Sequence, residues 1–248
     1  MRGRYPTSSF SYSFGPGPLT PAIKALIIAN VVAFVLAFYV QGLTRLFGLR
    51  PADVLESGRV WQPFTYMFLH GGLFHILFNM LTLWMFGVEL ERMWGTKFFA
   101  KYYVVAGLGA AATQIVLSFV PGAFGEQLYD SVTIGASGAV FGVLLAYALY
   151  FPNRPIYMYL VFPIPAKYFV MIMGGISLFA SVSGAGGGVA HTAHLGGLAA
   201  GYLFLRGRRF HLASEIQYRL TKWRINRMRR RFDVHSGGRR NDFDRRVH

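Results

Sequence analysis

The sequence predicts an all-α polytopic membrane protein that crosses the bilayer with six transmembrane helices. Only 14% of its 248 residues are charged, against about 25% in a typical soluble domain. Hydrophobic residues make up 54% of the chain, and they fall in long blocks. A helix needs about 20 mostly apolar residues to cross the hydrocarbon core, and the chain has room for six such blocks.

The ends of the blocks coincide with residues that break helices. Pro121 and Gly122 end the third block, Pro152 ends the fourth, and a Gly-rich run at 184–188 precedes the sixth. The predicted spans are 22–40, 68–88, 98–120, 134–150, 168–182 and about 188–205.

Charge predicts how the chain is oriented. The formal net charge is +15, and most of it follows residue 205. Lys and Arg concentrate on the cytoplasmic side, so both termini are predicted to be cytoplasmic, most simply at a prokaryotic plasma membrane. We expect a disordered lead at 1–20, a membrane domain at 21–206 and a basic tail at 207–248.

The basic tail is expected to form a partly amphipathic helix on anionic lipid headgroups. Nucleic acid is not an expected partner for a tail tethered to a bilayer. The start of the chain lacks the apolar core of a cleavable signal peptide. There are no cysteines, which excludes disulfides and thiolate nucleophiles.

Polar side chains inside three spans are the candidate functional groups, because such groups are costly in hydrocarbon. His75 and Asn79 lie in the second span, Ser137 in the fourth and His194 in the sixth. Ser137 is expected about one turn below the start of its span, and His194 about 9 Å into its own. His75 has a similar expected depth, so these groups are predicted to meet near one membrane face.

Ser137 and His194 are the predicted nucleophile and general base of a Ser–His dyad. A hydroxyl needs a base to take its proton, and no acidic residue lies at the same depth to complete a triad. Phe141 follows Ser137 by four residues and is placed to stack on the imidazole. The Ser137 backbone N–H and the Asn79 and His75 side chains are candidate oxyanion donors.

Small residues beside the dyad predict a close helix crossing. Gly138 and Gly142 form a GxxxG pattern in the fourth span, and Gly197 and Gly201 form another in the sixth. Such faces let helix backbones approach closely, which a Ser–His hydrogen bond between two helices requires.

Three motifs resemble those of the rhomboid family of intramembrane serine proteases. They are HGGLFHILFNM at 70–80, GASGAVFG at 135–142 and HTAHLGG at 191–197. The resemblance covers about residues 20–205 and implies a six-helix rhomboid-like bundle. It also implies a serine endopeptidase that cleaves transmembrane segments of single-span membrane proteins, with Ser137 and His194 as its dyad and no metal or cofactor.

The resemblance extends to residues around the dyad. His75 and Asn79 would line the oxyanion hole with Ser137. Gly135, Gly138 and Phe141 would support the nucleophile, and Glu91 and Gly95 would be structural. The sequence departs from many relatives at Gln62, where they carry Arg after Trp61, and from some at Phe141, where they carry Tyr.

Several alternatives stay open on the residues alone. His191, one turn before His194, is a rival base. His70, His75, His191 and His194 could bind zinc, although no HExxH pattern is present. A catalytically silent rhomboid-like membrane-protein binder in quality control and a small transporter with a proton relay are rival functions. The sequence does not specify the substrate, the cleavage site or the oligomeric state.

Overall fold

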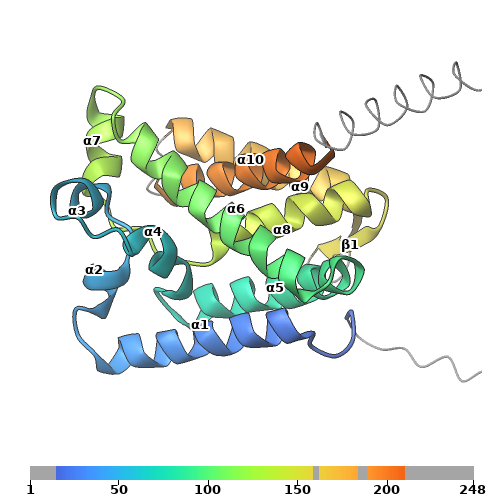
Figure 1. The fold of residues 1–248 in the computed structure, drawn as a ribbon. Helices are drawn as coiled ribbons and strands as arrows, with labels where there is room; N and C mark the ends of the chain where they lie inside the picture. The colour runs from blue at the N-terminus through green and yellow to red at the C-terminus, as the bar shows by residue number, and fades with distance from the viewer. Residues whose placement is uncertain (1–14, 159–161, 184–188, 210–248) are drawn as a thin grey trace, which may run out of the picture. The chain divides into compact units, whose positions relative to one another are not determined.

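The computed structural model describes residues 15–158, 162–183 and 189–209, which are mostly helical (Figure 1). The long helices are α1 (Pro21–Tyr39), α5 (Leu73–Trp94), α6 (Thr96–Leu117), α8 (Ser137–Tyr150), α9 (Ala166–Ser183) and α10 (Val189–Arg209). The shorter elements are α2 (Leu43–Phe47), α3 (Pro51–Glu56), α4 (Gln62–Thr65), the 3-10 helix η1 (Tyr66–Phe68), α7 (Ala123–Asp130), β1 (Pro155–Met158) and β2 (Phe162–Pro165). The predicted helical fold class is confirmed.

The described helices carry the apolar surface of an integral membrane protein. By length and composition, α1, α5, α6 and α9 can each cross a membrane. α8 is apolar but has 14 residues, which is about 21 Å of helix. Large apolar side chains such as Val35, Phe78 and Phe179 are exposed on α1, α5 and α9. Soluble proteins rarely expose continuous apolar surface of this kind, so these faces suit lipid.

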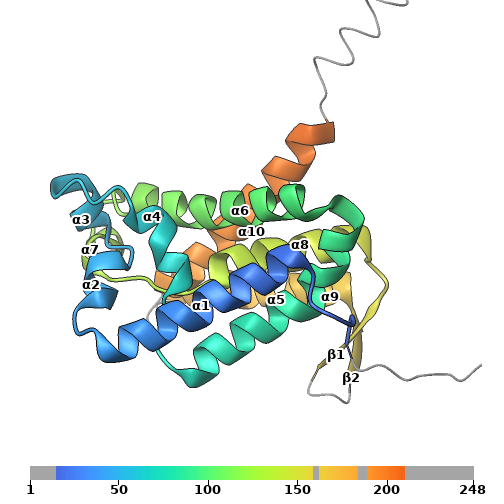
Figure 2. The same ribbon diagram turned by 60° about the horizontal axis from the view of Figure 1, so that its bottom comes forward.

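α8 is the central helix of the bundle and packs against α5, α6 and α9 (Figures 1 and 2). Glycines bring α10 against α8 and α6. A Cβ on Gly197 would lie 1.9 Å from the carbonyl oxygen of Gly138, and one on Gly109 would lie 2.1 Å from Cβ of Ala200. Side chains larger than hydrogen at these glycines would push the helices apart.

A carboxylate from α5 caps the N-terminus of α1. Glu91 accepts hydrogen bonds from the backbone N–H groups of Ala22 at 2.9 Å and Ile23 at 3.0 Å. The hydroxyls of Thr20 and Thr96 also donate to it. The free N–H groups and partial positive charge of a helix start stabilise an anion, which explains a glutamate that is only 2% exposed.

Residues 15–20 are bound to α5, so the predicted disorder of the lead is wrong for this stretch. Arg92 donates to the carbonyl oxygen of Pro16 at 2.6 Å. The Trp84 indole N–H donates to that of Gly17 at 3.1 Å. The prediction followed the Gly and Pro content of the segment and could not anticipate that its carbonyls meet donors from a distant helix.

The remainder of the predicted lead, residues 1–14, lies outside the described residues. The tail from residue 210 onward, with its predicted amphipathic helix, lies outside them too. Contacts between residues divide the chain into two compact units, Met1–Arg206 and Gly207–His248.

The second predicted span has wrong ends. The sequence predicts a span at 68–88, whereas α5 runs from Leu73 to Trp94. Gly72 is extended and precedes the first helical turn. The helix continues past its apolar stretch because Glu91 is satisfied inside the bundle, and it ends at Gly95, whose φ is +82°.

The fourth span begins later than predicted, at Ser137 instead of residue 134. Gly135 has a φ of +125°, which is incompatible with an α-helix. Ser137 is therefore the first residue of its helix and does not lie one turn inside it. The other four long helices match the predicted spans to within four residues at each end.

A β-hairpin between α8 and α9 was not predicted (Figure 2). β1 and β2 pair antiparallel, with Ile156 opposite Ile164 and Tyr157 opposite Pro163. The segment is rich in aromatic and β-branched residues, which favour strands. From the sequence this segment is predicted only as the connection between the span that Pro152 ends and the next span.

Candidate active site

Extended backbone before α8 holds Ser137 in position. The N–H of Gly135 donates to the carbonyl oxygen of Tyr66 at 3.0 Å. Thr133 and Leu49 exchange two backbone hydrogen bonds of 2.8 and 2.9 Å. These bonds fix the segment on the long first loop, so the position of Ser137 depends on that loop as well as on α8.

Ser137 and His194 are in hydrogen-bond contact although they are 57 residues apart. Nε2 of His194 lies 2.8 Å from Oγ of Ser137. The Phe141 ring stacks on the imidazole, with centroids 4.1 Å apart and planes 6° from parallel. Stacking restricts rotation of the imidazole, so Nε2 stays directed at the hydroxyl. This is the geometry that activation of a serine by a histidine requires.

Asn79 lies on the α5 side of the same site. Its Nδ2 donates to the carbonyl oxygen of His75 at 2.8 Å. An amide NH₂ has two hydrogens, so one remains for another acceptor. Asn79 and Ser137 both line one cavity, so this donor group and the hydroxyl face the same space.

His75 contacts the backbone next to Ser137 through its ring edge. Its Nδ1 accepts from the N–H of Gly71 at 3.4 Å, which assigns the proton of the neutral ring to Nε2. A Cβ on Gly135 would lie 2.7 Å from that Nε2 and 3.7 Å from Oγ of Ser137. The Nε2 edge of His75 therefore lies against the backbone that leads into Ser137.

The cavity beside Ser137 has a volume of about 230 Å³ and lies between α5, α8 and α9. Its lining is largely apolar and includes Phe86, Phe169 and Met173. The cavity can accept an apolar side chain next to a hydrogen-bonded hydroxyl.

Two further histidines lie near the site. The His191 ring meets that of His194 edge-on, with centroids 5.6 Å apart, and no hydrogen bond to Ser137 is found for it within the described chain. His70 is 5% exposed, and its ring centroid lies 4.9 Å from that of His75. His194, not the rival His191, is thus the histidine bonded to Ser137.

One residue of the site is not among those that the sequence predicts. Ser177 of α9 lies with Oγ 3.5 Å from Nδ1 of His194. A serine in an apolar helix is usually a packing residue, so composition alone does not single it out. The signal was its hydroxyl within an apolar span, the same signal that selected Ser137.

Comparison with known proteins shows the family. The family model described as the Rhomboid domain matches residues 57–208, more than half of the chain. The chain belongs to the rhomboid family.

Relatives of this rhomboid occur in plants, bacteria and yeast. RHOMBOID-like protein 12, mitochondrial, of Arabidopsis thaliana is 29% identical over 71% of this chain and 55% of its own length. Rhomboid protease GluP of Bacillus subtilis is 32% identical over 63% of this chain and 27% of its own. Rhomboid protein 1, mitochondrial, of Saccharomyces cerevisiae is 31% identical over 55% of this chain and 38% of its own length. The chain thus spans about half or less of these relatives.

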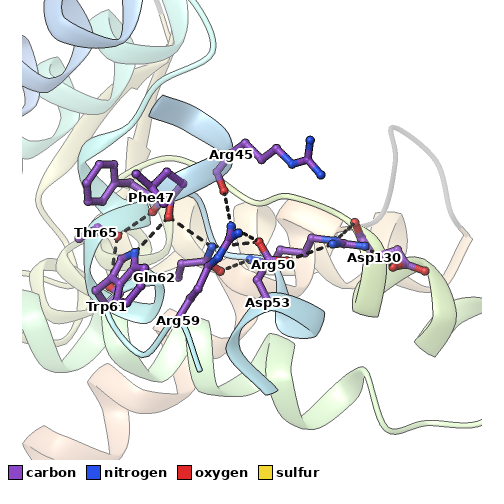
Figure 3. Close-up of polar contacts among 10 residues, drawn as sticks. Arg45, Phe47, Arg50, Asp53, Arg59, Trp61, Gln62, Thr65 and Asp130 are labelled. Atoms are coloured by element: carbon purple, nitrogen blue, oxygen red, sulfur yellow. Dashed lines mark hydrogen bonds and ion pairs between the residues drawn. The ribbon is translucent and has the colours of Figure 1, made fainter. Parts of the chain in front are cut away.

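In this rhomboid, Arg50 joins the first loop to α7 (Figure 3). Its guanidinium donates to Oδ1 of Asp130 at 2.7 Å and to Oδ1 of Asp53 at 3.0 Å. Hydrogen bonds to Asp130 and then Asp53 raise the pKa of Arg50 above its ordinary value, because both carboxylates stabilise the charged guanidinium. Asp130 ends α7 and is followed by the segment of Thr133 and Gly135, which the bridge therefore helps to hold.

Asp53 is the central acceptor of this loop network (Figure 3). Besides Arg50 it accepts from Arg59 at 2.7 Å and from Nε2 of Gln62 at 3.3 Å. Oε1 of the fully buried Gln62 accepts from the backbone N–H of Arg50 at 3.0 Å. Gln62, the departure from the Trp-Arg pattern, thus anchors the loop from inside, while Arg59 supplies a cation.

The zinc alternative finds no geometric support in the described part of this rhomboid. Among residues 15–158, 162–183 and 189–209, no group of three His, Cys, Asp or Glu side chains is arranged to hold a metal ion.

Proposed function

We propose that this rhomboid is an intramembrane serine endopeptidase that cleaves transmembrane segments of single-span membrane proteins. The observation that carries the proposal is the 2.8 Å contact between Oγ of Ser137 and Nε2 of His194, beside a cavity that also holds Asn79. The relative named a protease, GluP, supports the same reaction class.

The reaction begins when His194 Nε2 takes the hydroxyl proton and Ser137 Oγ attacks the scissile carbonyl carbon. The tetrahedral intermediate collapses as the imidazolium returns the proton to the leaving amine, and the peptide C–N bond breaks. An acyl ester on Ser137 remains. Water then attacks this ester with His194 again as base, which releases the carboxylic acid and restores the serine.

The tetrahedral intermediate carries a negative oxygen that needs donors. We assign this role to the backbone N–H of Ser137, the second amide hydrogen of Asn79 and Nε2–H of His75. A residue that begins a helix has a backbone N–H without an intrahelical acceptor. Loss of one oxyanion donor lowers the rate by about 10²–10³.

Substrate access is proposed between α5 and α9, because the cavity beside Ser137 is bounded by these helices. Phe78 of α5 is 61% exposed and also lines the cavity, so the lipid-facing surface and the cavity are contiguous there. A helical substrate hides its carbonyls in its own hydrogen bonds, so cleavage requires it to unwind near Ser137.

The membrane topology is part of the proposal. Six spans within 21–206 would put both termini on the same side of the membrane. The basic residues near the ends of the chain favour the cytoplasm as that side. A prokaryotic plasma membrane is the simplest location. The basic residues of 207–248 would bind anionic headgroups.

The function is tested by cleavage in liposomes against a panel of single-span substrates. Wild-type protein is expected to cleave at least one of them, and Ser137→Ala and His194→Ala to cleave none. His191→Ala is the matched control, since it removes an adjacent imidazole of the same helix, and it should retain cleavage. Binding of the panel proteins without cleavage by wild type would instead favour a catalytically silent membrane-protein binder.

A further inference from the structure

The second nitrogen of the His194 ring faces a buried hydroxyl of α9. Oγ of Ser177 lies 3.5 Å from Nδ1, and Ser177 is only 2% exposed. Among the described residues it is the one side chain found in hydrogen-bond contact with Nδ1. Catalytic hydrogen bonds are often long before substrate binds and shorten in the complex.

The contact has a consequence for the imidazole tautomer. A neutral imidazole carries one proton, so Nε2 can accept from Ser137 only when the proton sits on Nδ1. Oγ of Ser177 can accept that Nδ1–H. In Ser-His-Asp enzymes an aspartate holds the ring in the same tautomer, and no carboxylate contacts His194 among the described residues.

Ser177 also differs from other polar side chains in the long helices. A serine or threonine inside a helix usually donates to the carbonyl oxygen four residues earlier. Thr82 does so at 2.7 Å and Thr113 at 2.9 Å. Among the described residues Ser177 makes no such bond, and the contact found for its hydroxyl is the one with His194. Its hydroxyl is therefore directed away from its own helix and toward the base.

The face of α9 that carries Ser177 also forms a wall of the cavity. Phe169 and Met173 line that cavity, and they precede Ser177 by eight and four residues. Residues four apart share one helix face. A substrate that displaces these two side chains would also shift the group that contacts the base.

We infer that Ser177 is a positioning residue that accepts the Nδ1–H of His194 and thereby keeps Nε2 free to take the Ser137 proton. The inference rests on the proposed protease function. Helix α9 would then both line the substrate cavity and hold the His194 imidazole in position.

The test is a pair of variants with nearly equal shape at position 177. Ser177→Thr keeps a hydroxyl, whereas Ser177→Val has none. We expect kcat for the best-cleaved panel substrate to be roughly 3- to 10-fold lower in the valine variant than in the threonine variant. KM and the thermal unfolding midpoint should be equal in the two. Equal kcat values would overturn the role of Ser177.

The matched control is the same pair at Ser181, one turn further along α9. Ser181 is 6% exposed, and its Oγ has no hydrogen-bond partner among the described residues. Ser181→Thr and Ser181→Val are expected to give equal kcat. A threonine–valine difference as large at 181 as at 177 would contradict a specific role for Ser177.

The tautomer itself gives a readout that does not depend on turnover. Nitrogen NMR of histidine-labelled protein in liposomes should find the proton of His194 on Nδ1 in wild type and Ser177→Thr. In Ser177→Val part of the signal should move to Nε2–H, and an unchanged spectrum would overturn the inference. A wild type no more active than Ser137→Ala would refute the protease function itself.

Discussion

A Cβ on Gly135 would lie 2.7 Å from Nε2 of His75, so the backbone before Ser137 and the His75 ring are in direct contact. Gly135 also has a φ of +125°, which L residues with a side chain rarely adopt. Gly135 thus has two roles. Its backbone conformation prevents α8 from beginning before Ser137, and it forms one wall of the candidate oxyanion hole.

Gly135→Ala is expected to lower kcat/KM by at least about 100-fold, as loss of one oxyanion donor does, because the new methyl displaces His75. Gly122→Ala is the matched control. Its φ is +98° and a Cβ there meets nothing within 4 Å, so it should cost stability while the folded enzyme keeps its activity. Equal kcat/KM for the two variants would contradict the assigned contact.

Asn79→Ala is expected to lower kcat by about 10²–10³ with little change in KM, because an oxyanion donor acts in the transition state. Asn30 makes the same kind of bond, from Nδ2 to the carbonyl oxygen of Leu26 at 2.8 Å, but lies in α1. Asn30→Ala should therefore leave kcat unchanged. The kcat values of both variants are measured by steady-state cleavage. An unchanged kcat in Asn79→Ala would show that Asn79 does not stabilise the transition state.

The loop network predicts an order of stability losses. Asp53 has a side chain 10% exposed and that of Asp130 is 67% exposed. Asp53→Ala should lower the free energy of unfolding by about 2–3 kcal/mol, since it removes the charged acceptor of Arg59 and Gln62. Each donor then keeps only a 3.4 Å bond to a backbone carbonyl oxygen. Asp130→Ala should change it little, because exposed ion pairs contribute little. Reversible unfolding in mixed micelles measures both, and the reverse order would disprove the central place of Asp53.

The crossing of α8 and α10 should be intolerant of even one methyl group. Gly197→Ala would place a Cβ 1.9 Å from the Gly138 carbonyl oxygen, and overpacking of this kind costs about 1–3 kcal/mol. Separation of the helices also lengthens the bond between Ser137 and His194, so cleavage should fall. Gly175→Ala meets nothing within 4 Å and should retain stability and activity. An unaffected Gly197→Ala protein would argue against close packing there.

Four polar residues of the site could be found from the sequence because polar side chains stand out within apolar spans: His75, Asn79, Ser137 and His194. Ser137 and His194 were selected in this way, and the structure brings Oγ and Nε2 to 2.8 Å. Their depths were less predictable. Apolar composition predicts that the fourth span begins at residue 134. The helix begins only at Ser137, because Gly135 has a backbone conformation that an α-helix does not allow.

Contacts between distant segments could not be predicted from one sequence. The cap of α1 by Glu91 and the bridge from Arg50 to Asp130 each join residues about 70 to 80 positions apart. In the first loop, Arg50 and Arg59 both bind Asp53 and hold the loop together, which their spacing in the sequence did not indicate. Ser177 was not predicted because a serine within an apolar helix is usually a packing residue.

Activation of Ser137 by His194 can be tested through the site of reaction with a fluorophosphonate, which modifies activated serines. Intact-protein and peptide mass spectrometry of the folded wild type should find one adduct, on Ser137. His194→Ala should abolish the adduct and His191→Ala should retain it. A wild type without an adduct, or labelling of Ser137 that survives His194→Ala, would contradict activation of the serine by this histidine.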